Sequence, residues 1–428
     1  MRIYHVLWLL PVLACFLVAG IIGCTTPAGM ALRSMPTLDS GASESGEASQ
    51  TARQEQPAAT GVLEPEPQAG ILTAGSFDDT AYPKFFRKFI QKVDKENGQG
   101  SNRVTEKLQG KLLVLQCVDS SGGPVGNAKV RVINEQNRTI AKLVSRSDGR
   151  ILLMPSWDGY TADDRLRVQI TPPNGGQSIV RKLPKHATNL RVTVPDATSE
   201  KPSKLDLVLV LDTTGSMDDE LNYLKAEIKS IIKKVSEKFP SVEQRYSLIV
   251  YRDDGDEYVV RKSDFTKSVD RFQRTIEKEN AAGGGDQPEA VHRGLEEAAR
   301  LQWRSGDTAR VVFFIADAPP HAKHQKRTLA AVQKLRSRGI AIYPVACSDT
   351  QAPLEILMRG SAMLTGGQYL FLTDDSDVGD SHEEPHIPFY HVQHLNQLMV
   401  RMVSNELAGR QLPIDEDDIV RTVGNPPK

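Results

Sequence analysis

Three apolar runs stand out along the chain, because nearly every residue in each run is hydrophobic. They are Leu205–Leu211, Arg310–Ala316 and Ile340–Ala346. A run of this length without alternation predicts a strand buried on both faces, as in a parallel sheet covered by helices. Asp212 follows the first run and Asp317 follows the second. The pattern therefore predicts two carboxylates at the carboxyl ends of buried strands.

Segments with helical spacing separate these runs. From Met217 to Phe239 apolar residues recur every three or four positions, and Pro240 ends the pattern. Further predicted helices cover Pro288–Trp303, Leu329–Leu335 and His391–Leu407, and further predicted strands cover Tyr246–Tyr251, Glu257–Val260 and Tyr369–Leu372, the last closing the sheet. Strands that alternate with helices predict an α/β fold with a doubly wound, mostly parallel sheet over residues 205–409.

An earlier part of the chain has a different period. Within residues 109–196, apolar and polar residues alternate at Ala128–Val132, Leu166–Ile170 and Leu190–Val194, with Gly- and Pro-rich turns between them. Alternation of this kind predicts half-buried strands. The expected structure is a small antiparallel β-sandwich that precedes the α/β domain.

The N-terminus has the pattern of an export signal. A short basic start precedes an apolar run from Val6 to Gly23, which ends at Cys24. Ile21–Cys24 resembles a bacterial lipobox, so residues 1–24 are interpreted as a lipoprotein signal peptide with lipidation at Cys24. Val12–Cys15 fits the same pattern loosely. The alternative is an uncleaved membrane anchor, because the run is just long enough to span a bilayer.

Two connecting segments follow the signal. Residues 25–82 are rich in Ser, Gly, Ala, Pro, Glu and Gln, with few large apolar side chains, and predict a disordered tether. Residues 83–108 predict an amphipathic helix and a linker. The helix either packs on the next domain or lies on an anionic membrane surface.

Composition adds few constraints. The chain has 428 residues, of which 39% are hydrophobic and 25% charged, as expected for two or three globular domains. The net charge of -1 gives no argument for nucleic acid as a partner. After cleavage at Cys24 only Cys117 and Cys347 remain, and their spacing predicts neither a disulfide nor a cysteine metal site. Residues 410–428 predict a disordered acidic tail.

The candidate chemistry gathers at one edge of the predicted sheet. Asp212, Thr214 and Ser216 follow the first buried strand, Asp286 lies in a glycine-rich loop before a helix, and Asp317 follows another buried strand. Carboxylates and hydroxyls are ligands for Mg²⁺, and clustered carboxylates repel each other unless a cation neutralises them. Taken one at a time, Ser216 and Asp286 also fit ordinary helix caps.

The motif Asp212-x-Thr214-x-Ser216 resembles the first motif of the von Willebrand factor A family, Asp-x-Ser/Thr-x-Ser. The order of the elements is similar over Leu205–Leu407, and Asp317 matches the family's strand-end aspartate. Asp286 stands where the family most often has a threonine. The resemblance implies a metal-ion-dependent adhesion site for Mg²⁺ or Mn²⁺, at which a protein partner offers an acidic or other oxygen to the metal.

The sandwich region resembles the prealbumin-like, carboxypeptidase-regulatory type, which implies a spacer. The acidic turn Tyr251–Asp256 resembles a stretch in a bacterial subgroup of the von Willebrand factor A family, and is interpreted as a hairpin turn, with metal ligation as the alternative. His321 and His324 are spaced for one helix face and are expected to face solvent, with contact to a ligand as the alternative. The insertion Thr373–Tyr390 is interpreted as a solvated loop, with a second cation site as the alternative.

Together these patterns predict an exported cell-envelope protein, anchored to the membrane by lipid and facing the periplasm or the cell surface. Its expected function is metal-dependent protein binding. A metal-stabilised scaffold for envelope complexes is one alternative. An Mg²⁺-dependent phosphohydrolase with Asp212 as nucleophile is another, but such enzymes usually want a second acid where Thr214 stands. No side chains suggest a nucleophile–base pair, and no enzymatic activity is expected.

Overall fold

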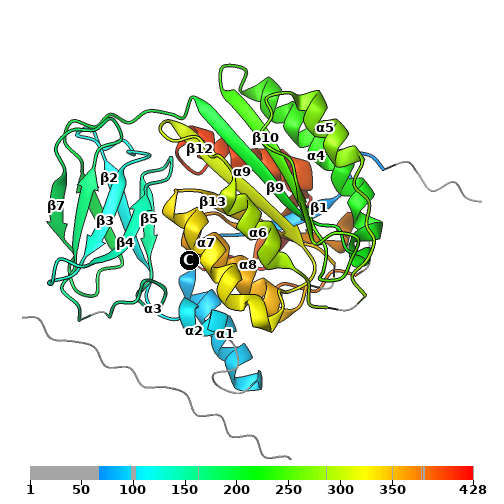
Figure 1. The fold of residues 1–428 in the computed structure, drawn as a ribbon, viewed down its shortest axis with the longest axis horizontal. Coiled ribbons are helices and arrows are strands. Elements are labelled where there is room, and N and C mark those ends of the chain that lie inside the picture. The colour runs from blue at the N-terminus through cyan, green and yellow to red at the C-terminus, as the bar shows by residue number, and fades with distance from the viewer. Residues whose placement is uncertain are drawn as a thin grey trace, which may run out of the picture. The chain divides into compact units, whose positions relative to one another are not determined.

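The computed structural model describes residues 67–97, 103–161, 163–285, 287–348, 350–376, 378 and 381–427. Cys24, the predicted signal and most of the predicted tether lie outside these residues, so these interpretations stay predictions. The described elements form one nine-stranded sheet, which helices cover, and two smaller sheets (Figure 1).

The large sheet has the strand order β11-β10-β9-β12-β13-β14-β1-β15-β16. Its strands are β1 Thr73–Phe77, β9 Lys204–Asp212, β10 Glu243–Tyr251, β11 Val260–Lys262, β12 Thr308–Ala316, β13 Ala341–Ala346, β14 Tyr369–Thr373, β15 Tyr390–His394 and β16 Arg421–Val423. The five strands from β10 to β14 in this order run parallel, while β1, β11, β15 and β16 pair antiparallel. The predicted α/β fold with a mostly parallel sheet is confirmed.

Both faces of the sheet are buried, as the continuous apolar runs predict. Along β9 the leucines at 205, 207, 209 and 211 enter one core, and Val208 and Val210 enter the core on the opposite face. Helices α4 (Asp218–Lys238), α5 (Val269–Glu277) and α9 (Leu395–Ala408) complete the first core. Helices α6 (Val291–Arg300), α7 (Gln325–Ser337) and α8 (Ala352–Thr365) complete the second. The sheet is therefore doubly wound.

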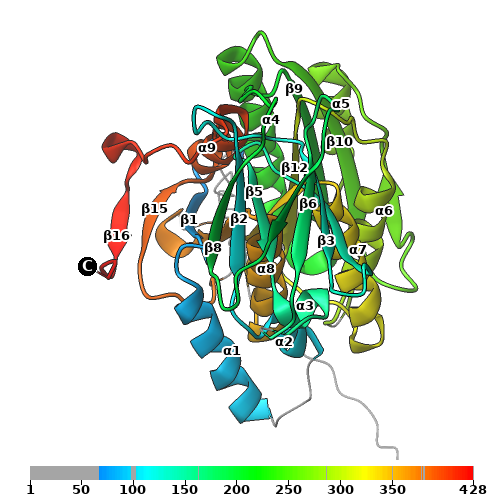
Figure 2. The same ribbon diagram turned by 90° about the vertical axis from the view of Figure 1, so that its left-hand side faces the viewer.

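Strand β1 lies in the segment predicted to be tether. It pairs antiparallel with both β14 and β15, so β14 does not close the sheet (Figure 2). The sequence Thr-Ala-Gly-Ser-Phe carries little hydrophobic signal, but its small residues fit where they are. A Cβ atom on Gly75 would lie 2.3 Å from the ring of Phe371. Close packing against an aromatic neighbour therefore explains the glycine in this strand.

Four other elements differ from the predictions. Residues 391–394, predicted to begin the last helix, belong to β15, and β16 lies in the tail predicted to be disordered. The predicted strand Glu257–Val260 starts only at Val260. The helix predicted from Pro288 starts at Val291 and ends at Arg300. Pairing with a neighbouring strand decides the first two cases, and such pairing leaves no local pattern in the sequence.

The two smaller sheets share one hydrophobic core. One has the order β5-β2-β8 and the other β4-β3-β6-β7, with β2 Leu113–Val118, β3 Lys129–Ile133, β4 Thr139–Val144, β5 Arg150–Leu153, β6 Arg167–Thr171, β7 Ile179–Lys182 and β8 Asn189–Thr193. The pairs are antiparallel except for β2 and β8, which run parallel and so correct the expectation of a purely antiparallel domain. After β5 comes the short helix α3 (Pro155–Asp158), whose Asp158 forms a buried ion pair of 2.7 Å with Arg336 of α7.

The predicted amphipathic helix is α1 (Pro83–Asn97). Its buried side chains Phe86, Phe89 and Ile90 pack with α2 (Arg103–Leu108) and with α8. The helix therefore packs on the fold, but its partners include α8 of the α/β domain as well as Leu152 and Met154 of the next domain, on which alone it was predicted to pack. Among the described residues, none of the helices is long and apolar enough to cross a membrane.

Candidate metal centre

The first loop of the candidate site follows β9. Oδ1 of the fully buried Asp212 accepts hydrogen bonds from the Thr214 backbone N–H (3.0 Å) and the Thr214 hydroxyl (2.8 Å). The Ser216 hydroxyl lies 3.3 Å from the Thr214 hydroxyl, and Ser216 is exposed. Asp212 Oδ2 has no hydrogen-bond partner among the described residues. The strand-to-helix turn thus brings three oxygen-bearing side chains together, with one side open to solvent.

Asp317 supplies the second carboxylate. Leu211 pairs with Ile315 on the adjacent strand, so β9 and β12 end at the same edge of the sheet, which we call the carboxyl edge. Asp317 is 2% exposed, and within the described part of the chain its Oδ1 has no hydrogen-bond partner. Burial raises the pKa of Asp317, and burial followed by the charge of Asp317 raises the pKa of Asp212. Burial is the largest cause of both shifts, and like charges add to it, from Asp317 at Asp212 and from Glu220 and Asp219 at Asp317.

Glu289 is a third carboxylate here, and the sequence analysis gave it no role. It is 3% exposed, and its Oε2 lacks a hydrogen-bond partner in the described structure. Burial, then the charges of Asp212 and Asp253, raises its pKa to about 9. Its backbone N–H donates to the Pro319 carbonyl (2.9 Å), which joins its loop to the loop after β12. The sequence could have indicated Glu289, because this acid lies in the same glycine-rich loop as Asp286.

The glycine-rich loop approaches the site closely. Gly284 has φ +74°, and a Cβ atom there would lie 3.0 Å from Glu289 Oε1 and 3.1 Å from Thr214 Cβ. Its N–H donates to both carboxylate oxygens of Asp256 at 3.1 and 2.9 Å. A side chain in place of Gly284 would push the loop away from the first turn. Asp286 itself lies outside the described residues, so its place among the ligands stays a prediction.

Positive charge is missing from this group of acids. Among the described residues, no Lys, Arg or His forms an ion pair with Asp212, Asp317 or Glu289. The nearby Arg252 is buried, but it donates to the backbone carbonyls of Thr213 (3.1 Å) and Asn280 (2.9 Å). Three carboxylates with a free oxygen each, and two hydroxyls, match the ligand set of a hard divalent cation. The donor set therefore fits Mg²⁺ or Mn²⁺.

The neighbouring features differ in part from the predictions. The acidic turn after β10 is a hairpin turn to β11, as predicted, and the Arg252 N–H donates to the Val259 carbonyl (3.2 Å). His321 and His324 do not simply face solvent. His321 Nε2 lies 2.6 Å from Asp253, and His324 stacks on His292 with ring centroids 4.0 Å apart. Both histidines are half-buried because these partners cover one side of each ring.

The insertion Thr373–Tyr390 is attached to the sheet through its charged side chains. His382 bridges Asp374 (2.7 Å) and Glu220 of α4 (3.0 Å), and Asp375 pairs with Arg421 of β16 (2.7 Å). Asp377 and Asp380 lie outside the described residues. These contacts show that the described part of the insertion is held on the fold, while a cation there stays a prediction.

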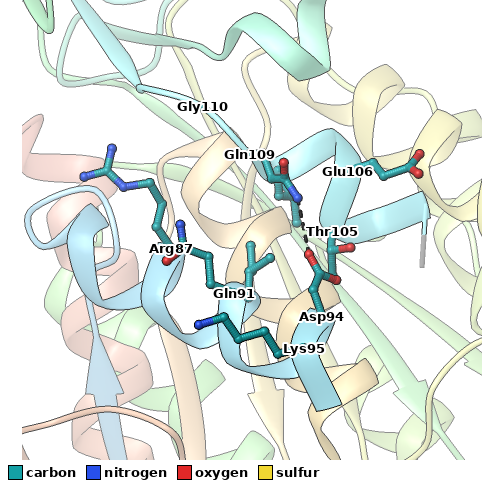
Figure 3. A pocket seen from close by; sticks show the side chains of 10 residues that line it. Arg87, Gln91, Asp94, Lys95, Thr105, Glu106, Gln109 and Gly110 are labelled. Atoms are coloured by element: carbon teal, nitrogen blue, oxygen red, sulfur yellow. Dashed lines mark hydrogen bonds between the residues drawn. The ribbon is translucent and has the colours of Figure 1, made fainter. Parts of the chain in front are cut away.

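A cavity of about 580 Å³ lies elsewhere, between α1 and α2 (Figure 3). Mostly polar and charged side chains line it, among them Arg87, Asp94 and Glu106, and Gln109 donates to Asp94 at 3.2 Å. The segment that joins the two helices, residues 98–102, lies outside the described residues. None of the candidate ligands at the carboxyl edge lines this cavity.

Comparison with known proteins agrees with the fold. Residues 206–372 match the von Willebrand factor A domain family. The chain is 33% identical over 118 residues to the alpha-protein kinase vwkA of Dictyostelium discoideum, a match that covers 27% of this chain and 19% of that protein. It is 27% identical over 184 residues to the human von Willebrand factor A domain-containing protein 7, with 41% of this chain and 20% of that protein covered. The matches thus span about a fifth of these relatives.

Two further similarities concern a viral protein and a solved structure. A putative ariadne-like RING finger protein of Acanthamoeba polyphaga mimivirus is 28% identical over 194 residues, which cover 40% of this chain and 19% of that protein. A solved structure of the conserved hypothetical protein BatB from Bacteroides thetaiotaomicron is 13% identical, with a TM-score of 0.33, and the match covers 48% of this chain and 99% of that chain.

Proposed function

We propose that the von Willebrand factor A domain of this chain binds one divalent cation, Mg²⁺ or Mn²⁺, and uses it to bind a protein ligand. Asp212, Thr214, Ser216, Asp286 and Asp317 are the proposed ligands, directly or through water. The observation that carries the proposal is the group of buried carboxylate oxygens on Asp212, Asp317 and Glu289 that have no partner among the described residues. Buried carboxylates without a counter-charge are strongly unfavourable, and a bound cation removes that penalty.

Each side chain has a distinct role in this proposal. Asp212 Oδ1 already accepts two hydrogen bonds from Thr214, which fix the carboxylate and leave Oδ2 for the metal or for a metal-bound water. The cation supplies a Lewis-acidic centre that attracts an oxygen of the partner. Because Ser216 and Gly215 are exposed, the partner's oxygen can approach from that side.

The number of acids at the site affects which oxygens of a protein partner the metal attracts. Asp212, Asp317 and Glu289 surround the site with three carboxylates before Asp286 is counted. Two unit charges about 4 Å apart interact by roughly 4 kcal/mol at an effective dielectric of about 20. A cation that is already neutralised attracts a further carboxylate weakly, so the proposed partner offers neutral or weakly acidic oxygens, such as amides and backbone carbonyls.

The test is capture of a partner from envelope extracts with the full chain, in Mg²⁺ and in EDTA. Wild type is compared with Asp212→Asn, and Asp264→Asn serves as a control on an exposed acid of another loop. Partners retained only by wild type and the control, and only in Mg²⁺, support the proposal. Identical capture in Mg²⁺ and EDTA by all three proteins contradicts it.

The scaffold alternative differs in one readout. The ion pair of Arg336 with Asp158 and the contact of Arg146 with Glu406 fix the two-sheet domain on the α/β domain, which suits a rigid spacer. A scaffold would use the metal for stability alone, so its partners would remain bound to Asp212→Asn once that variant is folded.

A phosphohydrolase would release phosphate from an aryl phosphate in Mg²⁺, and we expect no phosphate release above background.

The proposed location follows from the N-terminal pattern alone. Lipidation of Cys24 would anchor the protein to a membrane of the cell envelope, facing the periplasm or the cell surface. Cys24→Ser is expected to leave the precursor unprocessed and to release it from the membrane fraction. If the variant is still processed at residue 24 and still sediments with membranes, the anchor is wrong.

A further inference from the structure

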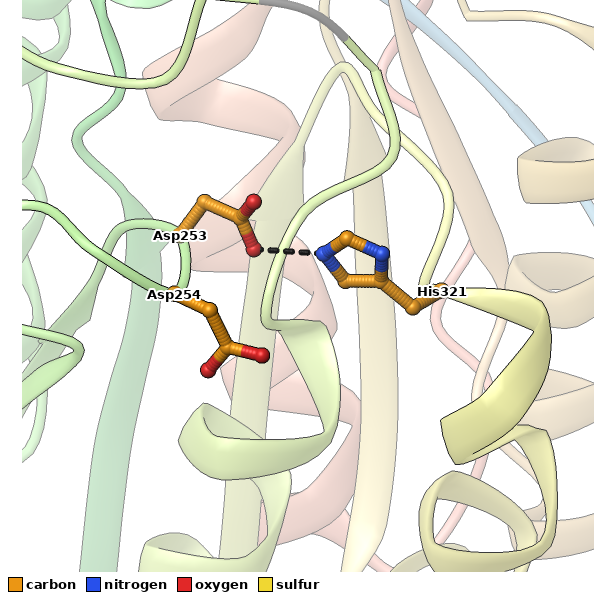
Figure 4. A group of neighbouring side chains, drawn as sticks. All are labelled: Asp253, Asp254 and His321. Atoms are coloured by element: carbon orange, nitrogen blue, oxygen red, sulfur yellow. Dashed lines mark hydrogen bonds and ion pairs between the residues drawn. The ribbon is translucent and has the colours of Figure 1, made fainter. Parts of the chain in front are cut away.

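A second group of metal-ligating side chains lies beside the first. Asp253 and Asp254 belong to the turn between β10 and β11, and His321 follows β12 (Figure 4). One ligand atom from each of the three side chains lies within 4.8 Å of the other two, and His321 Nε2 is 2.6 Å from Asp253 Oδ1. The three residues come from two loops far apart in sequence, so their convergence is a feature of the fold.

We propose that Asp253, Asp254 and His321 bind a second divalent cation, of the zinc or manganese type, at a site separate from the Mg²⁺ site. An imidazole nitrogen with two carboxylates is a ligand set that suits Zn²⁺, Mn²⁺ or Co²⁺ and is poor for Mg²⁺, which prefers oxygen ligands only. Zn²⁺ or Co²⁺ in the presence of saturating Mg²⁺ therefore distinguishes the second site from the first. This inference does not depend on the proposed protein-binding function.

Glu289, which belongs to the first site, also feels the charge of this second group. It is nine-tenths buried with a free Oε2, and the charges that act on it are those of Asp212, Asp317, Asp253 and Asp256. One divalent cation leaves most of this negative charge uncompensated. A second cation held by Asp253 would add positive charge to this group of acids.

The local scaffold holds the ligands in place. Asp256 accepts hydrogen bonds from the Asp253 N–H (2.9 Å) and from the Gly284 N–H, so one carboxylate positions the turn against the glycine-rich loop. The Glu289 N–H bonds to Pro319, two residues before His321. The turn that carries Asp253 and the loop before His321 are thus held by backbone contacts that do not involve the metal-binding atoms.

A further histidine is in reach of the same site. His324 Nε2 lies 3.9 Å from Asp254 Oδ2, and its ring stacks on the buried His292. His324 is a candidate fourth ligand.

Lys323 is a neighbouring positive charge that opposes a bound cation. Its ammonium lies 3.3 Å from Asp254 Oδ2, but its side chain is 62% exposed. An exposed pair of this kind contributes little to stability, so the lysine can turn into solvent when a metal arrives. Its removal therefore provides a test in the opposite direction, because loss of this charge is expected to tighten metal binding.

The experiment titrates Co²⁺ into the full chain in saturating Mg²⁺ and follows the visible d–d absorption, with Zn²⁺ as competitor. Wild type is expected to bind one Co²⁺ that Zn²⁺ displaces. His321→Gln is expected to weaken Co²⁺ binding at least tenfold. His186→Asn, an exposed histidine of the two-sheet domain with φ +59°, is the matched control and should bind as wild type does.

Two further variants make the result decisive. Lys323→Gln is expected to tighten Co²⁺ binding about threefold, and a surface change of this kind leaves folding intact. Asp212→Asn should keep the Co²⁺ signal, since it alters only the Mg²⁺ site. The proposal is overturned if His321→Gln binds Co²⁺ as tightly as wild type, if Lys323→Gln does not tighten binding, or if Asp212→Asn alone abolishes the signal.

Discussion

Two aspartates on the same strand have opposite surroundings. Asp206 and Asp212 lie six residues apart on β9, and both are 0% exposed. Asp206 accepts paired hydrogen bonds from the Arg245 guanidinium (2.9 and 2.7 Å), and also from the Arg304 backbone N–H and Nε at 2.8 Å each. Asp212 has an oxygen without a partner in the described structure and the acid Asp317 as its neighbour.

The different surroundings of Asp206 and Asp212 indicate that the two ends of β9 have different roles. At the amino end, the fold itself supplies two guanidinium groups for one buried charge, as expected of a structural ion pair. At the carboxyl edge, the fold gathers acids and leaves them without a counter-ion among the described residues. A protein able to neutralise Asp206 could neutralise Asp212 in the same way, so the missing charge at the carboxyl edge indicates an external cation.

The largest effect is expected at the amino end. Asp206→Asn leaves Arg245 and Arg304 partly buried without their counter-charge, and removal of one partner from such a network costs about 3 kcal/mol or more. Urea unfolding should show this loss equally in Mg²⁺ and in EDTA. A loss below about 1 kcal/mol would mean that the arginines are compensated by solvent, as in a surface pair.

A smaller effect concerns the pH dependence of the metal-free protein. Asp212, Asp317 and Glu289 have raised pKa values in the folded state, so between pH about 4 and about 9 the folded state binds more protons than the unfolded state. Stability therefore falls as pH rises through this window. In EDTA we expect a loss of about 2 kcal/mol between pH 5 and pH 8. Asp212→Asn should reduce this loss of stability. An unchanged loss would contradict the link between protonation of Asp212 and the stability of the fold.

The smallest expected effect is a stabilisation, whereas Asp206→Asn is expected to destabilise the protein. In EDTA at pH 8, Asp212→Asn removes one of the clustered charges and should raise the free energy of unfolding by about 1 kcal/mol. Urea unfolding of Asp212→Asn in parallel with Asp206→Asn measures both effects. Destabilisation of the same size in the two variants would mean that the two ends of β9 do not differ in the way described.

The sequence predicted the central sheet because its strands are buried on both faces and leave continuous apolar runs. It also indicated Asp212, Thr214, Ser216 and Asp317, which follow directly after such runs. It did not indicate Glu289 as part of the site, nor the arginine partners of Asp206, since both depend on contacts between elements distant in the chain. Strands β1 and β16 were missed for the same reason. Their place is decided by pairing with β14 and β15 and not by their own residues.

The central claim is that the carboxyl edge takes its missing charge from a cation. The most direct test measures the free energy of unfolding of wild type and Asp212→Asn over a series of Mg²⁺ concentrations. A ligand that binds only the folded state at ten times its dissociation constant stabilises it by about 1.4 kcal/mol. We predict an Mg²⁺-dependent rise of this kind for wild type and almost none for Asp212→Asn. Equal stabilisation of both proteins, or of neither, would contradict the account.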